Sequence, residues 1–107
     1  MLVHGTSADH TRWATVVPRL AERFTTYAVD RRGRGASPDP PGPYAIEREF
    51  EDIEETLEAI GGEVDMLGHS YGAVCSLEAA LISDHVRRLI LYEIQRPIIQ
   101  ATARAPR

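Results

Sequence analysis

The chain alternates between segments with two different hydrophobic patterns. Four short runs rich in apolar, β-branched or aromatic residues have the length of strands: 1–3, 25–29, 64–67 and 89–92. Longer segments with apolar residues on a helical repeat, or with helix-forming composition, lie between them: 13–23, 45–60 and 72–81. Short apolar runs favour buried strands, whereas a repeat of three to four residues favours a helix with one face on a core. The predicted order is therefore strand, helix, strand, helix, strand, helix, strand.

This alternation predicts the α/β class, with a parallel sheet of about four strands and helices on both faces, because parallel neighbours need crossover connections. The 107 residues are enough for one core and too few for two domains. We therefore treat residues 1–107 as a single domain or part of one. A proline-rich stretch at residues 38–43 predicts a surface loop, and the tail from Gln95 to Arg107 shows no clear period.

The segment from Ala45 to Ile60 gives the clearest helical pattern. Its apolar residues recur every three or four positions: Ile46, Phe50, Ile53, Leu57 and Ile60. The intervening Glu and Asp residues predict an acidic outer face. Gly61-Gly62 then ends the helix, since glycine adopts the left-handed conformation of a helix cap.

The pentapeptide Gly68-His69-Ser70-Tyr71-Gly72 has the pattern G-x-S-x-G. It lies between a predicted strand and a predicted helix, which is the context that a nucleophile elbow needs. Side chains would clash at the flanking positions of so sharp a turn, and Gly68 and Gly72 avoid this clash. We therefore predict that Ser70 is a catalytic nucleophile and that Gly68, His69 and Gly72 form the elbow. The alternative is a serine in an ordinary glycine turn.

His4-Gly5-Thr6 follows the first predicted strand. In enzymes with a nucleophile elbow, a backbone N–H from this loop joins the N–H after the nucleophile to stabilise the oxyanion of acyl transfer. We expect Thr6 and Tyr71 to supply these two N–H groups. A His-Gly pair by itself indicates only a turn, so this prediction depends on its position one strand ahead of the elbow unit.

Three blocks together resemble the α/β-hydrolases in order and spacing: Leu2-Val3-His4-Gly5, Asp30-Arg31-Arg32-Gly33-Arg34-Gly35-Ala36-Ser37 and Leu67-Gly68-His69-Ser70-Tyr71-Gly72. The resemblance covers nearly the whole chain, but only the part of that fold from its third to its sixth strand. It implies a partial α/β-hydrolase fold from which the N-terminal hairpin and the C-terminal half are absent. It also implies a hydrolase that acts on an ester-like acyl substrate through Ser70.

The triad of this family runs in the order Ser, then Asp or Glu, then His, and no histidine follows His85. His4 belongs to the oxyanion loop, and His10 and His85 fall in predicted loops ahead of any acid candidate. Glu93 ends the last predicted strand, where some relatives place the acid, and is a candidate for that role. The alternative is a strand-end carboxylate in solvent or a packing partner of the preceding tyrosine. We expect the triad histidine to be absent from this chain, which leaves Ser70 a weak nucleophile.

Charge and composition exclude several other classes. The 12 Lys and Arg against 16 Asp and Glu give a net charge of −4, which repels nucleic acid and anionic membranes. No apolar run reaches the ~20 residues that span a bilayer, so we expect a cytoplasmic protein. The single cysteine, Cys75, excludes an internal disulfide and indicates a buried thiol. Gly33-Arg34-Gly35 begins a dinucleotide-binding pattern, but Pro38 replaces its third glycine. We expect neither a cofactor nor a metal.

We expect an esterase-like serine hydrolase whose small-molecule acyl substrate forms an acyl-enzyme that water then hydrolyses. A serine at the elbow, in place of the aspartate of haloalkane dehalogenases and epoxide hydrolases, argues for acyl transfer within this family. One alternative is a catalytically inactive fragment that acts as a scaffold or needs a partner chain, because exposed sheet edges invite self-association. Another is a binding module that uses the oxyanion loop as an anion site without turnover.

Overall fold

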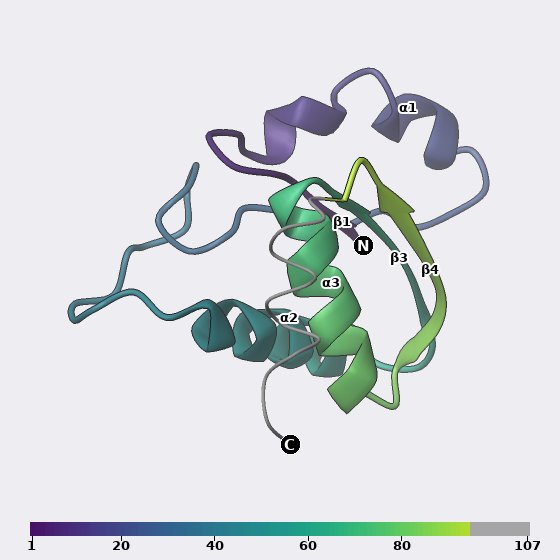
Figure 1. Cartoon of the computed structure of the whole chain (residues 1–107). Coiled ribbons are helices and arrows are strands. Elements are labelled where there is room, and N and C mark those ends of the chain that lie inside the picture. Colours follow the sequence, from purple (N-terminus) through teal and green to yellow (C-terminus); the bar gives the residue numbers. More distant parts are fainter. Residues whose placement is uncertain (95–107) are drawn as a thin grey trace.

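Strands and helices alternate along the chain in the computed structural model, which describes residues 1–94 (Figure 1). In chain order the elements are β1 (Leu2–Val3), the 3₁₀ helix η1 (His10–Trp13), α1 (Val17–Leu20), β2 (Ala28–Val29), α2 (Ile46–Ile60), β3 (Val64–His69), α3 (Tyr71–Ile82) and β4 (Val86–Tyr92). The tail from Gln95 to Arg107, for which the sequence indicates no regular element, lies outside the described residues.

All four strands belong to one parallel sheet in the order β2-β1-β3-β4. In the register of this sheet, Leu2 lies beside Ala28 of β2 and beside Leu67 of β3. The prediction of an α/β fold with a four-stranded parallel sheet is therefore confirmed. Because the strands are parallel, the loops that follow β1, β2 and β3 all leave the sheet at the same end.

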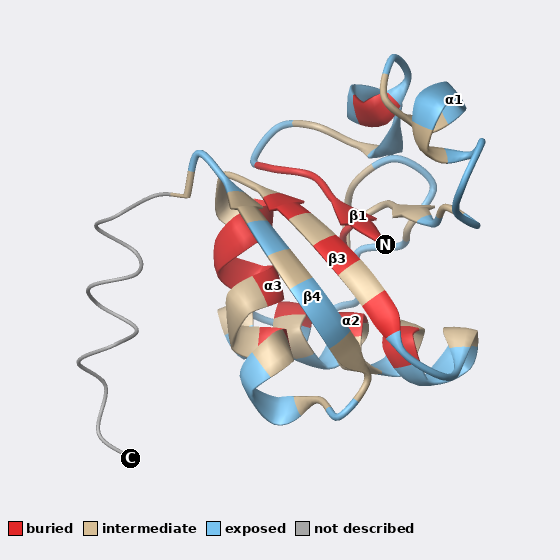
Figure 2. Cartoon of the chain, turned by 90° about the vertical axis from the view of Figure 1, so that its right-hand side faces the viewer, coloured by how far each residue is buried: buried red, intermediate tan, exposed pale blue. Residues whose placement is uncertain are grey.

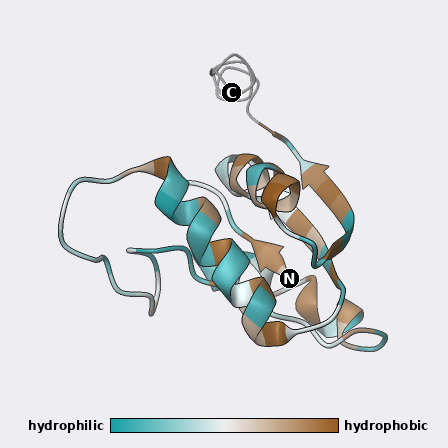
Figure 3. Ribbon diagram, turned by 90° about the horizontal axis from the view of Figure 1, so that it is seen from below, coloured by the Kyte–Doolittle hydropathy of each residue, from teal (hydrophilic) through white to brown (hydrophobic). Residues whose placement is uncertain are grey.

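The main core lies between the sheet and the helices α2 and α3 (Figure 2). Val3 and Met66 from the sheet form one cluster with Leu57 of α2 and Cys75 of α3, and each is at most 2% exposed. The hydrophilic side of α2 is turned away from this cluster (Figure 3). Burial raises the pKa of the Cys75 thiol to about 12, as expected of an unreactive core thiol.

The opposite face of the sheet is only partly covered. Leu2, Leu67 and Ile90 are neighbours across three strands, and together with Leu20 of α1 they line a groove of about 480 Å³. Ile90 is 62% exposed. Helices therefore lie on both faces, as predicted, but among the described residues this second face carries only the short helices η1 and α1.

The first helical segment differs most from its prediction. Instead of one helix from Trp13 to Arg23, the chain forms η1 and then α1, a separate helix of one turn. The Asp9 side chain accepts the N–H of Thr11 and begins η1. Pro18 lies in the first turn of α1, where its missing N–H breaks no hydrogen bond. The proline therefore marks the start of a second helix, not the interior of the first.

The remaining boundaries differ by a few residues, as is usual for element ends. β2 occupies only the last two residues of the predicted run from Thr25 to Val29, and β4 begins at Val86, ahead of the predicted start at Leu89. None of the helices within residues 1–94 is long and apolar enough to cross a membrane.

Candidate active site

Ser70 lies at the turn between β3 and α3 in a backbone conformation that residues other than glycine rarely adopt. Its φ is 56° and its ψ is −118°, which costs about 1–3 kcal/mol for a residue with a Cβ. The N–H of Ala73 donates to the Ser70 carbonyl oxygen over 3.0 Å and starts the helix at once. The sharp strand-to-helix turn that the G-x-S-x-G pattern requires is therefore present at Ser70.

The two glycines of the pattern allow the close contacts around this turn. A Cβ at Gly68 would lie 2.7 Å from the Cα of Ala73 and from Oγ of Ser76. A Cβ at Gly72 would overlap the backbone of Val3 and His4. The start of α3 therefore packs directly on the end of β1, and this contact brings the His4-Gly5-Thr6 loop beside the elbow.

The elbow has further contacts with β4 and with the loop after β1. The N–H of Ser70 donates to the carbonyl oxygen of Tyr92 over 2.9 Å. A Cβ at Gly5 would lie 3.1 Å from the Cβ of Ser70. Within residues 1–94, neither Thr6 nor Tyr71 uses its N–H in a turn, loop or cap hydrogen bond. As the first residue of α3, Tyr71 also lacks an acceptor inside its helix, so both N–H groups proposed for the oxyanion are available.

All four histidines of the sequence lie in the described part of the chain. Each has at least one ring nitrogen that bonds a group other than Ser70: His4 bonds Gly5 and Arg31, His10 bonds Asp30, His69 bonds Glu93, and His85 bonds Gly62. Nδ1 of His69 is buried without a hydrogen-bond partner among the described residues. No hydrogen bond joins Ser70 Oγ to a histidine in this part of the structure, so the absence of the triad histidine stays a prediction.

His69 of the elbow and Glu93, which follows β4, interact with each other. Nε2 of His69 lies 2.9 Å from Oε1 of Glu93. The His69 ring stacks on Tyr92 at a centroid distance of 5.2 Å and meets the edge of Trp13 at 6.4 Å. These contacts turn the His69 ring toward β4 and η1. The role of Glu93 as a triad acid stays a prediction, because its only described partner is His69.

His4 is fully buried and joins the ends of β1 and β2. Its Nε2 accepts the backbone N–H of Arg31 at 3.0 Å, so Nδ1 carries the proton that is donated to Gly5 O at 2.9 Å. Burial lowers the pKa of His4 from its ordinary value, in agreement with a neutral ring. His4 is therefore a structural residue of the loop after β1.

A buried ion pair lies behind the elbow. Nε and Nη2 of Arg31 donate to the two carboxylate oxygens of Glu49 at 2.9 and 2.7 Å. The Tyr44 hydroxyl donates to Glu49 Oε2 at 2.6 Å, so the Tyr71 hydroxyl donates to Tyr44 at 2.6 Å. The Arg31 guanidinium also stacks on the Tyr71 ring, 4.7 Å from its centroid. This network connects the loop after β2 to the first residue of α3.

The assignment of every acidic residue of α2 to an outer face is wrong for Glu49, which is 2% exposed. Glu49 follows Ile46 by three positions and precedes Ile53 by four, so the helical repeat itself places it on the core face. A carboxylate at such a position needs a cationic partner, and the arginines at 31, 32 and 34 supply the candidates. These two signals indicate a buried ion pair of Glu49, whereas the choice of Arg31 among the three arginines requires the three-dimensional structure.

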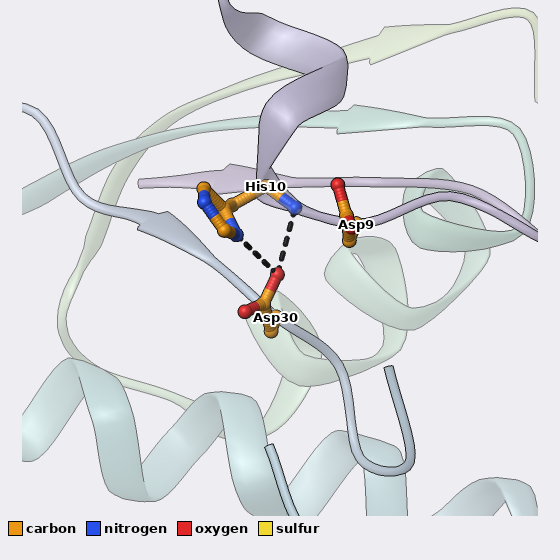
Figure 4. A group of neighbouring side chains, drawn as sticks. All are labelled: Asp9, His10 and Asp30. Carbon is orange, nitrogen blue, oxygen red and sulfur yellow. Dashed lines mark hydrogen bonds and ion pairs between the residues drawn. The ribbon is translucent and has the colours of Figure 1, made fainter. Parts of the chain in front are cut away.

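Asp30 organises the loop at the end of β2 (Figure 4). Its Oδ1 accepts both the backbone N–H and Nδ1 of His10 at 2.7 and 2.8 Å, and its Oδ2 accepts the N–H of Ala36 at 2.9 Å. A Cβ at Gly35 would overlap the Asp30 carboxylate. Although desolvation acts to raise it, the pKa of Asp30 is held at about 2 by these hydrogen bonds.

Among residues 1–94, two groups of side chains have the composition and spacing of metal ligands: Asp9, His10 and Asp30, and Glu54, Glu58 and His85. The hydrogen bond between His10 and Asp30 already occupies Nδ1 of His10, and Thr11 donates to Asp9. Nδ1 of His85 likewise bonds the Gly62 carbonyl oxygen. Nδ1 of each histidine is thus engaged within the fold, and we assign a metal to neither group.

A family model described as Alpha/beta hydrolase family matches residues 1–107. Together with the parallel sheet and the strand-to-helix turn at Ser70, this match shows that the chain belongs to the α/β-hydrolase family.

Within the family, the 2-(acetamidomethylene)succinate hydrolase of Mesorhizobium japonicum is 32% identical over 105 residues, covering 96% of this chain and 37% of that protein. The soluble epoxide hydrolase of a Corynebacterium species is 31% identical over 103 residues, covering 94% of this chain and 36% of that protein. The crystal structure of an α/β hydrolase from Sphaerobacter thermophilus matches with a TM-score of 0.77 at 43% identity, covering 84% of this chain and 35% of that one. The chain thus spans little more than a third of the length of the curated relatives it matches.

Proposed function

We propose that Ser70 is the nucleophile of acyl transfer from a small ester-like substrate, and that the general base is a histidine outside this sequence. The observation that carries the proposal is the strained conformation of Ser70, at φ 56° and ψ −118°, beside two available backbone N–H groups. Strain of this kind persists where the surrounding structure holds a functional group in place.

In the proposed reaction, Ser70 Oγ attacks the carbonyl carbon and gives its proton to the base. The N–H groups of Thr6 and Tyr71 donate to the oxyanion of the tetrahedral intermediate. The leaving alkoxide takes a proton as the intermediate collapses, and water then hydrolyses the acyl-serine. Loss of one such oxyanion donor lowers rates by about 10²–10³ in enzymes of this kind.

The names of two relatives suggest different chemistries. One relative is named for hydrolysis of an acetamido compound and the other for hydrolysis of epoxides. Ser70 supports the first, because a serine at the elbow forms an acyl-enzyme, whereas the epoxide hydrolases of this family use an aspartate there. We therefore propose esters, thioesters or amides as the substrate class.

Hydrolysis of p-nitrophenyl acetate by the purified chain tests this function. We expect slow turnover by the wild type, loss of it in Ser70→Ala, and retention of it in Ser83→Ala, which alters a serine at the far end of α3. Equal rates for wild type and Ser70→Ala would show that the hydroxyl of Ser70 takes no part in the reaction.

The second candidate is an inactive fragment that needs a partner chain. It is favoured by the engagement of all four histidines away from Ser70 and by the open groove beside Ile90. On this view the edges β2 and β4, or the groove, mediate self-association or binding of the partner. Sedimentation velocity between about 1 µM and 1 mM, which spans the dissociation constants of weak to moderate association, tests self-association. A folded monomer over this range contradicts self-association.

We further propose a cytoplasmic location. The single cysteine, which is free and buried, supports a reducing compartment. Fractionation of cells that express the tagged chain tests the location, and recovery with the membrane or secreted fraction contradicts it.

A further inference from the structure

The Gly5–Thr6 peptide unit is held from its carbonyl side. Nη1 of Arg31 donates to the Gly5 carbonyl oxygen at 3.0 Å, and Nδ1 of His4 donates to the same oxygen at 2.9 Å. A trans peptide unit is planar, and its C=O and N–H point in opposite directions. Two donors on the Gly5 oxygen therefore also set the direction of the Thr6 N–H, the first of the two proposed oxyanion donors.

The same guanidinium contacts the residue that supplies the second donor. Cζ of Arg31 lies 4.7 Å from the centroid of the Tyr71 ring. The ring is fixed at its other end by the hydrogen bond between the Tyr71 and Tyr44 hydroxyls. Tyr71 begins α3, so contacts that fix its side chain also limit movement of its N–H.

Arg31 is itself held in one orientation. Its Nε and Nη2 form a two-point pair with Glu49, and its backbone N–H donates to Nε2 of His4. Arg31 is 7% exposed and Glu49 is 2% exposed, so water does not compete strongly for these bonds. A planar guanidinium can make the carboxylate, carbonyl and ring contacts at once, whereas a lysine ammonium lacks this geometry.

Resting on the acyl-transfer function proposed above, we propose that Arg31 is a positioning residue that aligns both oxyanion donors, the N–H groups of Thr6 and Tyr71. The carboxylate of Glu49 lies against the guanidinium and balances its charge. Arg31 therefore contributes by orienting the two N–H groups and not by adding a net charge. The role is specific to Arg31 within its loop. The neighbouring Arg32 pairs with Asp52 of α2 at 2.6 and 2.8 Å and has no recorded contact with Gly5 or Tyr71 in the described residues.

In a Ser70→Cys variant the nucleophile is a thiolate, which needs no general base. The effect of the oxyanion donors on the reaction rate can therefore be measured without the missing histidine. In acylation by p-nitrophenyl acetate, the thiolate forms an Sγ–C bond, negative charge passes through the carbonyl oxygen, and p-nitrophenolate leaves with the electron pair. In alkylation by iodoacetamide, the thiolate forms an Sγ–C bond and iodide leaves, with no oxyanion. The ratio of the two rate constants therefore reports on the oxyanion site and cancels changes in thiolate concentration and access. The wild-type chain, whose one thiol is buried, gives the background.

The ratio for Ser70→Cys is compared with that of a free thiol and with those of variants at Arg31, Arg32 and Glu49. N-acetylcysteine gives the ratio for a thiol without an oxyanion site, and Ser70→Cys is expected to exceed it at least tenfold. Adding Arg31→Met is expected to lower the ratio at least tenfold, whereas adding Arg32→Met leaves it within about twofold, the range expected for a residue that shares no partner with the oxyanion donors. Because Arg31→Met leaves Glu49 buried without its partner, the variant with both Arg31→Met and Glu49→Gln is measured beside it.

The possible results distinguish the proposed oxyanion site from the proposed role of Arg31. A ratio for Ser70→Cys equal to that of N-acetylcysteine overturns the oxyanion site, and the role of Arg31 with it. A high ratio that survives in the folded variant with both Arg31→Met and Glu49→Gln overturns the role of Arg31 alone, whatever the ratio in Arg31→Met. A high ratio that falls in both Arg31 variants and persists with Arg32→Met supports the proposal.

Discussion

Gly72, at the start of α3, lies so close to His4, at the end of β1, that a Cβ on Gly72 would overlap the His4 backbone. The last glycine of the elbow pattern therefore sets the distance between the two loops that carry the proposed oxyanion donors. Two motifs separated by more than 60 residues meet at this contact.

Substitution of this glycine separates the two loops. We expect Gly72→Ala to lower the free energy of unfolding by about 2–4 kcal/mol, because backbone on both sides must move. Gly42→Ala is the control, because a Cβ there meets nothing within 4 Å and the only cost is the strain of a positive φ, which the helical Gly72 does not have. Urea unfolding followed by circular dichroism measures both. A loss no larger than that of the control contradicts the close contact.

Relief of the strain at Ser70 should stabilise the chain. Glycine adopts φ 56° and ψ −118° without steric cost, so we expect Ser70→Gly to raise the free energy of unfolding by about 1 kcal/mol after the greater entropy of the unfolded glycine is included. Ser70→Ala keeps the Cβ and should not gain this stability. If both variants unfold at the same urea concentration, the elbow is not strained.

Loss of the carboxylate at Glu49 leaves Arg31 buried without its partner. We expect Glu49→Ala to cost about 3–5 kcal/mol of unfolding free energy. Glu51→Ala, which removes an exposed carboxylate paired with Arg48 on the same helix, should cost less than about 1 kcal/mol. Thermal unfolding of the two variants gives the comparison. Similar losses would mean that the Arg31–Glu49 pair is not buried as described.

The pKa values of two histidines should shift in opposite directions from the ordinary value of 6.5. Burial lowers the pKa of His4, whereas the hydrogen bond to Asp30 raises the pKa of His10. The pair of His10 and Asp30 therefore stabilises the fold below pH 6.5, and this stabilisation is lost as the pH rises through the raised pKa of His10. Nuclear magnetic resonance titration of the ring carbons measures both values.

Asp30→Asn is the control for the His10 shift. The amide keeps the shape of the side chain and removes its charge, so the pKa of His10 should return toward 6.5 while that of His4 stays low. A His10 pKa at or below 6.5 in the wild type contradicts the ion pair seen in Figure 4.

Much of the fold follows from local patterns in the sequence. The repeat of Ile46, Ile53 and Leu57 predicts α2 almost to the residue, because one face of that helix packs on the core. The G-x-S-x-G pattern predicts the turn at Ser70, since only glycine allows such close backbone contact on both sides. Order and spacing also predict the parallel sheet, because each strand is followed by a segment long enough to cross back over it.

Other features depend on contacts between segments that are far apart in the sequence. The division of the first helical segment is an exception, because its signals are local. Asp9 caps η1 and Pro18 lies in the first turn of α1, and apolar periodicity reveals neither feature. The buried pair of Arg31 and Glu49 joins the loop after β2 to α2, and recognition of it requires that both residues be placed in three dimensions. The pair of Glu93 and His69, which lie 24 residues apart, could likewise be recognised only once both residues are placed in three dimensions.

Reaction with a fluorophosphonate probe tests most directly whether Ser70 is a nucleophile held ready for acyl transfer. The probe phosphonylates activated serines with loss of fluoride, and intact mass counts the adducts on the wild-type chain and on Ser70→Ala. We predict one adduct on the wild type and none on Ser70→Ala. The adduct should form slowly, because no histidine among residues 1–94 is hydrogen-bonded to Ser70, and faster when imidazole is added as an external base. No adduct on a folded wild-type chain, with or without imidazole, would contradict the assignment of Ser70 as the nucleophile.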